Sequence, residues 1–377
     1  MTGDSAETAA TGQRPAWKTV ARRVLPPLFS VAIVVAVFWF FLPQFTSVSA
    51  VWDSIKSMTW LQVGTLLLLA LWNLCTYFIV NVTTMPGLTY PQAAVATESS
   101  TAISNTVPGG GALGIGINYA MFSSWGFSKS RTTVSLLVSG VFNNFAKLAL
   151  PVLALALLAL QGSPSGGRLA AGLFGLLALA GAIAVFAMLL SSREAAAKVG
   201  RTAGRLASGV VRIFRRPPVQ GWDKATVKFR HRTIALLRAR WLSITLATLV
   251  SHVSLYVVLL VSLRFVGVTD AAVGWVEVLA AFAFARLLTA LPFTPGGLGV
   301  IELALITSLS AAGGDRADVA AGVLVFRALT YVLPIPLGAI AYVVWRRNRS
   351  WRRPPGGAPR TDLVAEWVEP DTIPTGG

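Results

Sequence analysis

Long hydrophobic runs alternate with short polar segments along this chain, and several runs are about twenty residues long. Apolar runs of this length cross the hydrocarbon core of a bilayer as helices. We therefore predict an all-α polytopic membrane protein. The simple spans are predicted at residues 25–42, 61–82, 132–160, 168–190, 241–265 and 319–345.

The first of these runs, residues 25–42, has two interpretations. Val48-Ser49-Ala50 is a weak cleavage site, so the run fits a signal peptide. We prefer a retained membrane anchor because three bulky side chains, Trp39, Phe40 and Phe41, lie at its end. In both cases the following segment, residues 43–60, is expected to be an external loop.

Two regions, residues 91–126 and 273–312, are too polar and too rich in glycine and proline for simple spans. Proline removes a backbone donor and glycine weakens a helix, so each region should contain a broken helix. Broken backbone at membrane depth is tolerated only against protein or a wet cavity. We predict two re-entrant hairpins around Pro-Gly-Gly motifs. The motif residues are Pro108, Gly109 and Gly110 in the first hairpin and Pro295, Gly296, Gly297 and Gly299 in the second.

The two regions correspond along the chain. Pro108, Asn143 and Pro151 match Pro295, Arg327 and Pro334 at offsets of 187, 184 and 183 residues. Since a cytoplasmic N-terminus makes the second hairpin enter from the side opposite to the first, this spacing favours an inverted repeat. A hairpin adds an even number of membrane crossings, so the predicted orientation is the same for six spans plus two hairpins as for eight to ten spans.

Charge supports this arrangement. The chain carries a net charge of +17, yet only 12% of its residues are charged and 54% are hydrophobic. Residues 191–240 hold thirteen Lys/Arg against two acids, which indicates a cytoplasmic loop by the positive-inside rule and argues against nucleic-acid binding. The predicted organisation is a disordered cytoplasmic tail (1–23), a first membrane half (24–190), a basic loop (191–240), a second half (241–346) and a disordered cytoplasmic tail (347–377).

Ionisable residues inside membrane segments are rare and usually mark a pathway or a partner. Helix N-termini after the glycine motifs would favour an anion such as a lipid phosphate, and arginine would bind it with charge-assisted contacts. An ion pair between Arg286 and Glu302 that only fixes the broken helix is an equally open interpretation, and Glu98 is considered as a partner of Lys147 or a proton carrier. The candidate lipid-headgroup residues are Arg286, Arg327, Glu302, Lys147, Glu98 and Asn105.

The segment from Pro295 to Glu302, which follows Arg286 and the run Leu288–Pro292, resembles the signature of the lysylphosphatidylglycerol synthase transmembrane-region family, which includes UPF0104-type proteins. The resemblance covers about residues 25–345 and implies a flippase-like role. It differs in the first half, where Gly109 to Gly116 contains neither the glutamate nor the arginine that family members often carry. Because the chain ends about thirty residues after its last span, we expect a stand-alone member without the synthase domain.

The leading hypothesis is a multi-pass plasma-membrane protein that translocates a phospholipid or lipid-linked headgroup between leaflets. A single cysteine, Cys75, and two histidines argue against a metal cluster, and we expect no cofactor and no enzyme activity. The alternatives are a scaffold that docks envelope-biosynthesis enzymes and, less favoured, a polyprenyl-phosphate-dependent transferase. The expected partners are membrane lipids with anionic headgroups.

Overall fold

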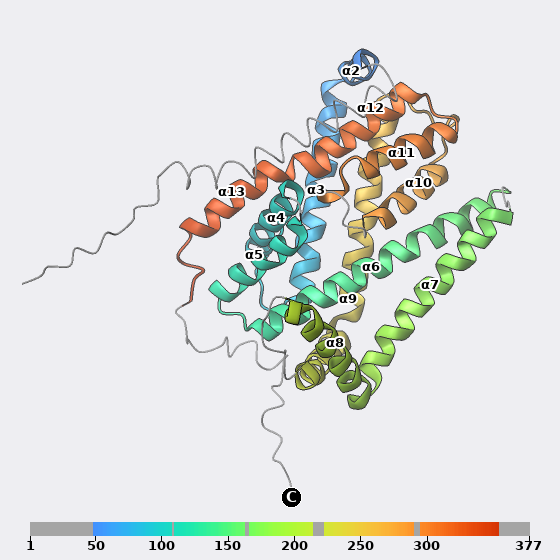
Figure 1. Cartoon of the computed structure of the whole chain (residues 1–377). Helices are drawn as coiled ribbons and strands as arrows, with labels where there is room; N and C mark the ends of the chain where they lie inside the picture. The colour runs from blue at the N-terminus through green and yellow to red at the C-terminus, as the bar shows by residue number, and fades with distance from the viewer. Residues whose placement is uncertain (1–47, 108, 163–165, 214–221, 290–294, 354–377) are drawn as a thin grey trace, which may run out of the picture.

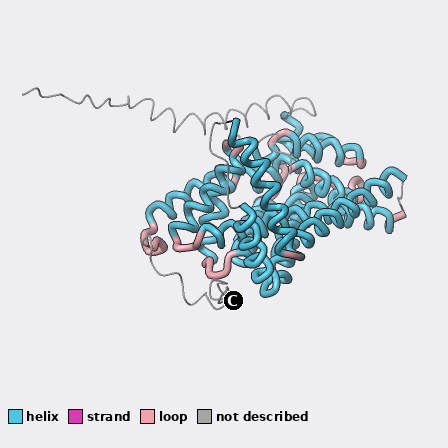
Figure 2. Tube along the Cα trace, turned by 60° about the horizontal axis from the view of Figure 1, so that its bottom comes forward, coloured by secondary structure: helices cyan, strands magenta, loops and turns pink. Residues whose placement is uncertain are grey.

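The computed structural model describes residues 48–107, 109–162, 166–213, 222–289 and 295–353 (Figure 1). In these ranges the chain forms helices joined by short loops, and Figure 2 shows no strand among them. The predicted all-α fold is therefore confirmed. Five of the helical runs are long and apolar enough to cross a membrane, so the protein is an integral membrane protein. The predicted run at 25–42 lies outside the described residues.

The long helices begin where the hydrophobic runs begin. Helix α3 (Trp60–Thr84) opens with a capping box, because the Thr59 hydroxyl accepts a hydrogen bond from the Gln62 N–H and the Gln62 side-chain oxygen accepts one from the Thr59 N–H. Helices α6 (Lys129–Leu160), α7 (Gly166–Ser191) and α9 (Trp222–Phe265) follow the predicted spans. Helix α7 lies at the edge of the molecule, and its central apolar side chains are not buried by the protein, as expected for a lipid-facing helix.

Three predicted loops or tails contain ordered structure. Part of the expected external loop at 43–60 forms helix α2 (Val48–Lys56), which packs against α12. The expected loop at 191–240 forms the amphipathic helix α8 (Arg193–Ile213) and the first turns of α9, which pack together. In the expected disordered tail, residues 348–353 fold back onto the first hairpin, where the Arg353 N–H donates to the Ser124 carbonyl. A one-dimensional hydropathy pattern cannot show these packing contacts.

The first hairpin consists of helices α4 (Tyr90–Thr106) and α5 (Gly110–Ser124), which lie side by side. Their contact depends on glycine. A Cβ atom at Gly114 would lie 2.6 Å from the Ser104 hydroxyl and 2.9 Å from the Ser100 carbonyl oxygen, and one at Gly110 would meet the backbone of Ile103. Small residues spaced by four let two helices approach closely in a membrane.

The second hairpin consists of α10 (Trp275–Leu288), the short 3₁₀ turn η1 (Pro295–Gly297) and α11 (Val300–Ala311). The last helical run is α12 (Arg316–Arg327), the π-helical turn η2 (Ala328–Val332) and α13 (Pro334–Arg347). The π turn ends two residues before Pro334, whose nitrogen cannot donate, and the Leu333 N–H donates to the Ala328 carbonyl.

Each hairpin packs against a helix from the other half of the chain. Helix α4 of the first hairpin packs against α13 of the second half, whereas α10 of the second hairpin packs against α6 of the first half. Helices α3 and α9 pack against one another between them (Figure 1). This exchange is what two related halves around a shared axis would produce, but the inverted repeat itself stays a prediction.

Candidate functional site

A cavity of about 720 Å³ lies where the two hairpins approach the long helices. Its walls come from both halves of the chain: α3, α4, α5 and α6 of the first half, and α9 to α13 with the turns η1 and η2 of the second. This volume is typical of ligand pockets, which hold a few polar groups in mostly apolar walls. The polar side chains among its lining residues are Asn73, Tyr77, Thr97, Glu98, Thr101, Ser104, Asn105, Asn143, Lys147, Arg286, Thr289, Arg327, Thr330 and Tyr331.

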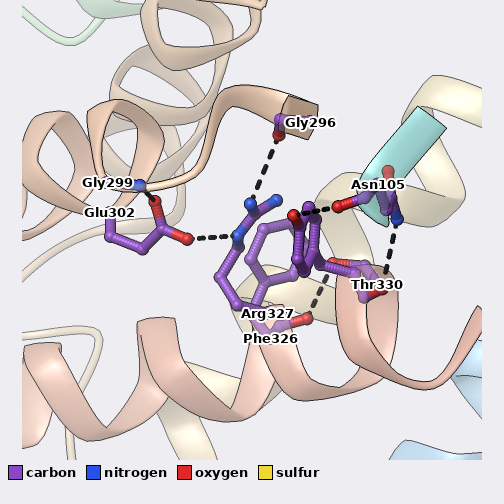
Figure 3. A network of polar contacts seen from close by, with 8 residues as sticks. Asn105, Gly296, Gly299, Glu302, Phe326, Arg327 and Thr330 are labelled. Atoms are coloured by element: carbon purple, nitrogen blue, oxygen red, sulfur yellow. Dashed lines mark hydrogen bonds and ion pairs between the residues drawn. The ribbon is translucent and has the colours of Figure 1, made fainter. Parts of the chain in front are cut away.

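Beside the cavity, Arg327 and Glu302 form a buried ion pair (Figure 3). The Arg327 Nε lies 2.6 Å from one Glu302 oxygen, and both residues are over 90% buried. The other Glu302 oxygen accepts the Gly299 N–H at 2.7 Å, and Arg327 also donates to the Gly296 carbonyl at 3.3 Å. The considered pair between Arg286 and Glu302 is therefore wrong, because Glu302 is three residues into α11 and faces α12.

Tyr331 joins the two hairpins. Its hydroxyl donates to the Asn105 carbonyl at 2.6 Å, and the Asn105 amide donates back to the Tyr331 carbonyl at 3.1 Å. Its ring also lies 4.3 Å below the Arg327 guanidinium, a cation–π contact. We did not predict Tyr331 from the sequence; the signal was its position four residues after Arg327 on the same helical run.

Position 296 requires glycine, both because of its backbone conformation and because of the neighbouring side chains. Its φ of 57° lies in the left-handed region, and a Cβ atom there would collide with the Tyr331 ring and lie 3.0 Å from the Asn105 amide oxygen. The second Pro-Gly-Gly motif thus reaches the end of the first hairpin. Pro108 and the structure of residues 290–294 lie outside the described residues.

Arg286 and Lys147 are the cavity's uncompensated cations. Arg286 lies in the last turn of α10, and its Nε is buried without a hydrogen-bond partner among the described residues. Neither side chain forms an ion pair within the described ranges. Their positive charges repel each other, and Arg286 is also repelled by Arg327. Since an unpaired cation in a low-dielectric interior is costly, this arrangement favours an anion between them.

Glu98 lines the same cavity from α4. Its residue is only 6% exposed, and neither carboxylate oxygen has a hydrogen-bond partner in the part of the chain that the structure describes. The considered ion pair between Glu98 and Lys147 does not form within 4 Å. Glu98 is therefore a buried acid with free acceptor capacity in the cavity that Lys147 and Arg286 also line.

The two half-helix N-termini differ. Helix α5 begins after Gly109, which gives no side-chain cap, and Gly109, Gly110 and Gly111 line the cavity. At α11 the Glu302 carboxylate already accepts the Gly299 N–H, so the positive end of this helix is compensated by the protein. Among the described helices, only the first hairpin therefore presents an N-terminus without a side-chain cap to the cavity.

The structure thus brings five of the six candidate residues to one cavity. Glu302 does not line it and instead holds Arg327. Of the glycine motifs, Gly109, Gly110, Gly296 and Gly297 line the cavity, whereas Gly299 contributes its N–H to Glu302. In the described ranges, no three His, Cys, Asp or Glu side chains lie together as a metal site would need.

Comparison with known proteins identifies the family. The UPF0104 membrane protein MJ1078 of Methanocaldococcus jannaschii is 40% identical over 62 residues, a match that covers 16% of this chain and 26% of that protein. The chain thus spans about a quarter of the length of this relative. The model of the lysylphosphatidylglycerol synthase TM region matches residues 28–338, which include both hairpins and the whole cavity. The chain therefore belongs to the family of the lysylphosphatidylglycerol synthase TM region.

Proposed function

We propose that this membrane protein translocates a lipid with an anionic headgroup between the leaflets and that the headgroup binds in the cavity between the hairpins. The observation that carries the proposal is the pair of uncompensated cations, Arg286 and Lys147, which face one cavity from opposite halves of the chain. A phosphate diester placed between them would neutralise charge that the described part of the protein leaves unpaired.

The charge distribution defines the role of each group. Arg286 offers a planar guanidinium suited to two phosphate oxygens, and Lys147 offers a compact ammonium. The N-terminus of α5, which has no side-chain cap, adds a partial positive charge to the same cavity. Arg327 is held by Glu302 and Gly296, so we assign it the task of fixing the second hairpin.

Transport by such a site requires that the headgroup reach it from either leaflet. Sites at the interface of two related halves, built from discontinuous helices near the bilayer midplane, are typical of secondary transporters. We propose transport and no enzymatic reaction, in a plasma membrane and with both termini in the cytoplasm. The match to the lysylphosphatidylglycerol synthase TM region supports a lipid-related role.

The test is a leaflet-redistribution assay in reconstituted vesicles with fluorescent phosphatidylglycerol. Wild-type protein should accelerate the loss of label asymmetry, and Arg286→Gln or Lys147→Gln should slow it at least tenfold. A charged hydrogen bond contributes about 1.5–3 kcal/mol, which corresponds to roughly 10–150-fold in rate or affinity. The matched control is Lys198→Gln, which removes an exposed cation on α8.

Equal rates for wild type and Arg286→Gln would overturn the proposal, provided that both proteins incorporate to the same extent. Lipid-resolved mass spectrometry on the purified proteins tests binding separately. Wild type should retain an anionic lipid class that the Arg286→Gln variant loses. Identical lipid profiles would leave the cations with a purely structural role and favour a scaffold.

A further inference from the structure

We propose that Glu98 exchanges a proton with the cavity water when an anionic headgroup enters or leaves, so that headgroup binding is coupled to uptake of one proton. This inference rests on the proposed function, because it concerns the same cavity. The inference adds the proton as a coupling ion and Glu98 as the residue that binds it.

The first observation is the isolation of Glu98. The residue is 6% exposed, lines the cavity, and receives no hydrogen bond at either carboxylate oxygen from the described residues. Structural carboxylates in this protein look different: both oxygens of Glu302 are bonded, one to Arg327 and one to the Gly299 N–H. Glu98 therefore has no part in fixing the fold through its carboxylate and remains available to the cavity contents.

The second observation is the charge balance of the cavity. The charged groups that face it are Lys147 from α6, Arg286 from α10 and Arg327 from α12, and Arg327 is compensated by Glu302. From α3 and η2 the facing titratable groups are the phenols of Tyr77 and Tyr331. Against α13, Glu98 presents its backbone, since its carbonyl would meet a Cβ atom at Gly338.

The two uncompensated cations can be balanced in two ways. In the empty cavity, an ionised Glu98 provides a negative charge on the cavity wall that no other described group neutralises. When a phosphate diester enters, two anions compete for Lys147 and Arg286, and like charges in one site disfavour each other's ionised form. Glu98 then takes a proton from the cavity water and becomes a neutral acid; departure of the phosphate reverses this step. One proton is thus bound for each anion bound.

One other buried titratable side chain lies near these cations. His252 on α9 is 3% exposed, its Nδ1 lies 3.0 Å from the Thr248 carbonyl oxygen, and its Nε2 has no partner in the described chain. It feels the charges of Arg286 and Lys147 but does not line the cavity. His252 is therefore the control for proton binding by a titratable group that does not line the cavity.

The experiment is isothermal titration calorimetry of short-chain phosphatidylglycerol into the full-length protein in detergent. Titrations between pH 5.5 and 8.5, in buffers of different ionisation enthalpy, give both the affinity and the number of protons bound. A phosphate diester does not titrate in this range. For wild type we expect proton uptake approaching one per lipid and an affinity that falls with rising pH, by up to tenfold per pH unit where Glu98 is ionised.

The variants identify the group. Glu98→Gln should bind lipid with no proton uptake and with an affinity independent of pH, whereas Glu98→Asp should keep the uptake and His252→Gln should leave it unchanged. Uptake that persists in Glu98→Gln and disappears in Lys147→Gln or His252→Gln would overturn the inference. Wild type that binds lipid without proton uptake would overturn the inference alone, whereas wild type that binds no anionic lipid would overturn the proposed function as well.

A melting curve for each variant shows whether the variant is folded. If Glu98→Gln is not folded, Glu98→Asp provides the test.

Discussion

The embedded charges of this protein fall into two groups that differ in their partners. Arg327 and Glu302 satisfy each other and the broken backbone beside them, through Gly296 and Gly299. Arg286 and Lys147 have no such partner among the described residues. The first group holds the backbone of the second hairpin, and the second group is the one to which we assign anion binding in the proposed function.

This division predicts that Glu302→Gln destabilises the protein strongly. Removing one partner of a buried ion pair leaves the other charge uncompensated and costs about 3–5 kcal/mol. We expect a clearly lower midpoint of thermal unfolding in detergent micelles. The control is Asp270→Asn, which removes the acid of the ion pair between Arg264 and Asp270. The Asp270 side chain is 69% exposed, and exposed ion pairs contribute about 0–1 kcal/mol to stability. A midpoint for Glu302→Gln as high as that for Asp270→Asn would contradict this account.

At the scale of helices, the first hairpin depends on close approach. Helix α5 carries glycines that face two different surroundings: a Cβ atom at Gly114 would press on the Ser100 carbonyl of α4, whereas one at Gly116 would meet nothing within 4 Å. Backbone groups of a helix cannot move aside as a flexible side chain can. The separation of α4 and α5 is therefore set by Gly114 and not by Gly116.

We expect Gly114→Ala to lower the unfolding midpoint and to reduce lipid transport, because α4 and α5 must separate at the end of the hairpin that lines the cavity. Gly116→Ala should leave both unchanged or raise the midpoint slightly, since alanine favours a helix over glycine by up to about 1 kcal/mol. Thermal unfolding and the vesicle assay measure the two effects. If both variants behaved alike, the contact between α4 and α5 would not limit stability.

At the scale of the whole molecule, the orientation in the membrane stays a prediction that labelling can check. The proposed topology places the turn after α6 outside the cell and helix α8 inside. In a Cys75→Ser background, Gln161→Cys should react with a membrane-impermeant maleimide on intact cells, whereas Lys198→Cys should react only after the membrane is opened. Both positions are exposed in the structure, so accessibility depends on the side of the membrane. The reverse pattern would invert the topology.

Hydropathy and backbone chemistry in the sequence determined the helical class, the positions of the described spans and the two breaks. These features depend on residues near each other in the chain: apolar runs long enough for a bilayer, and Pro-Gly-Gly segments that no lipid-exposed helix holds. The predicted hairpins at 91–126 and 273–312 correspond closely to α4–α5 and α10–α11. The predicted candidate residues Glu98, Lys147, Arg286 and Arg327 do meet at one cavity.

Only the tertiary structure decided which embedded charged side chains form ion pairs with one another. From the sequence, Arg286 is a candidate partner of Glu302, yet within the described residues it is Arg327 that forms this ion pair. Side-chain pairing depends on the rotation and tilt of packed helices, which a hydropathy pattern does not contain. The same holds for Tyr331, which reaches Asn105 across 226 positions of the chain from a π turn. Local composition shows where helices run and break, whereas helix packing assigns the partners of the embedded charges.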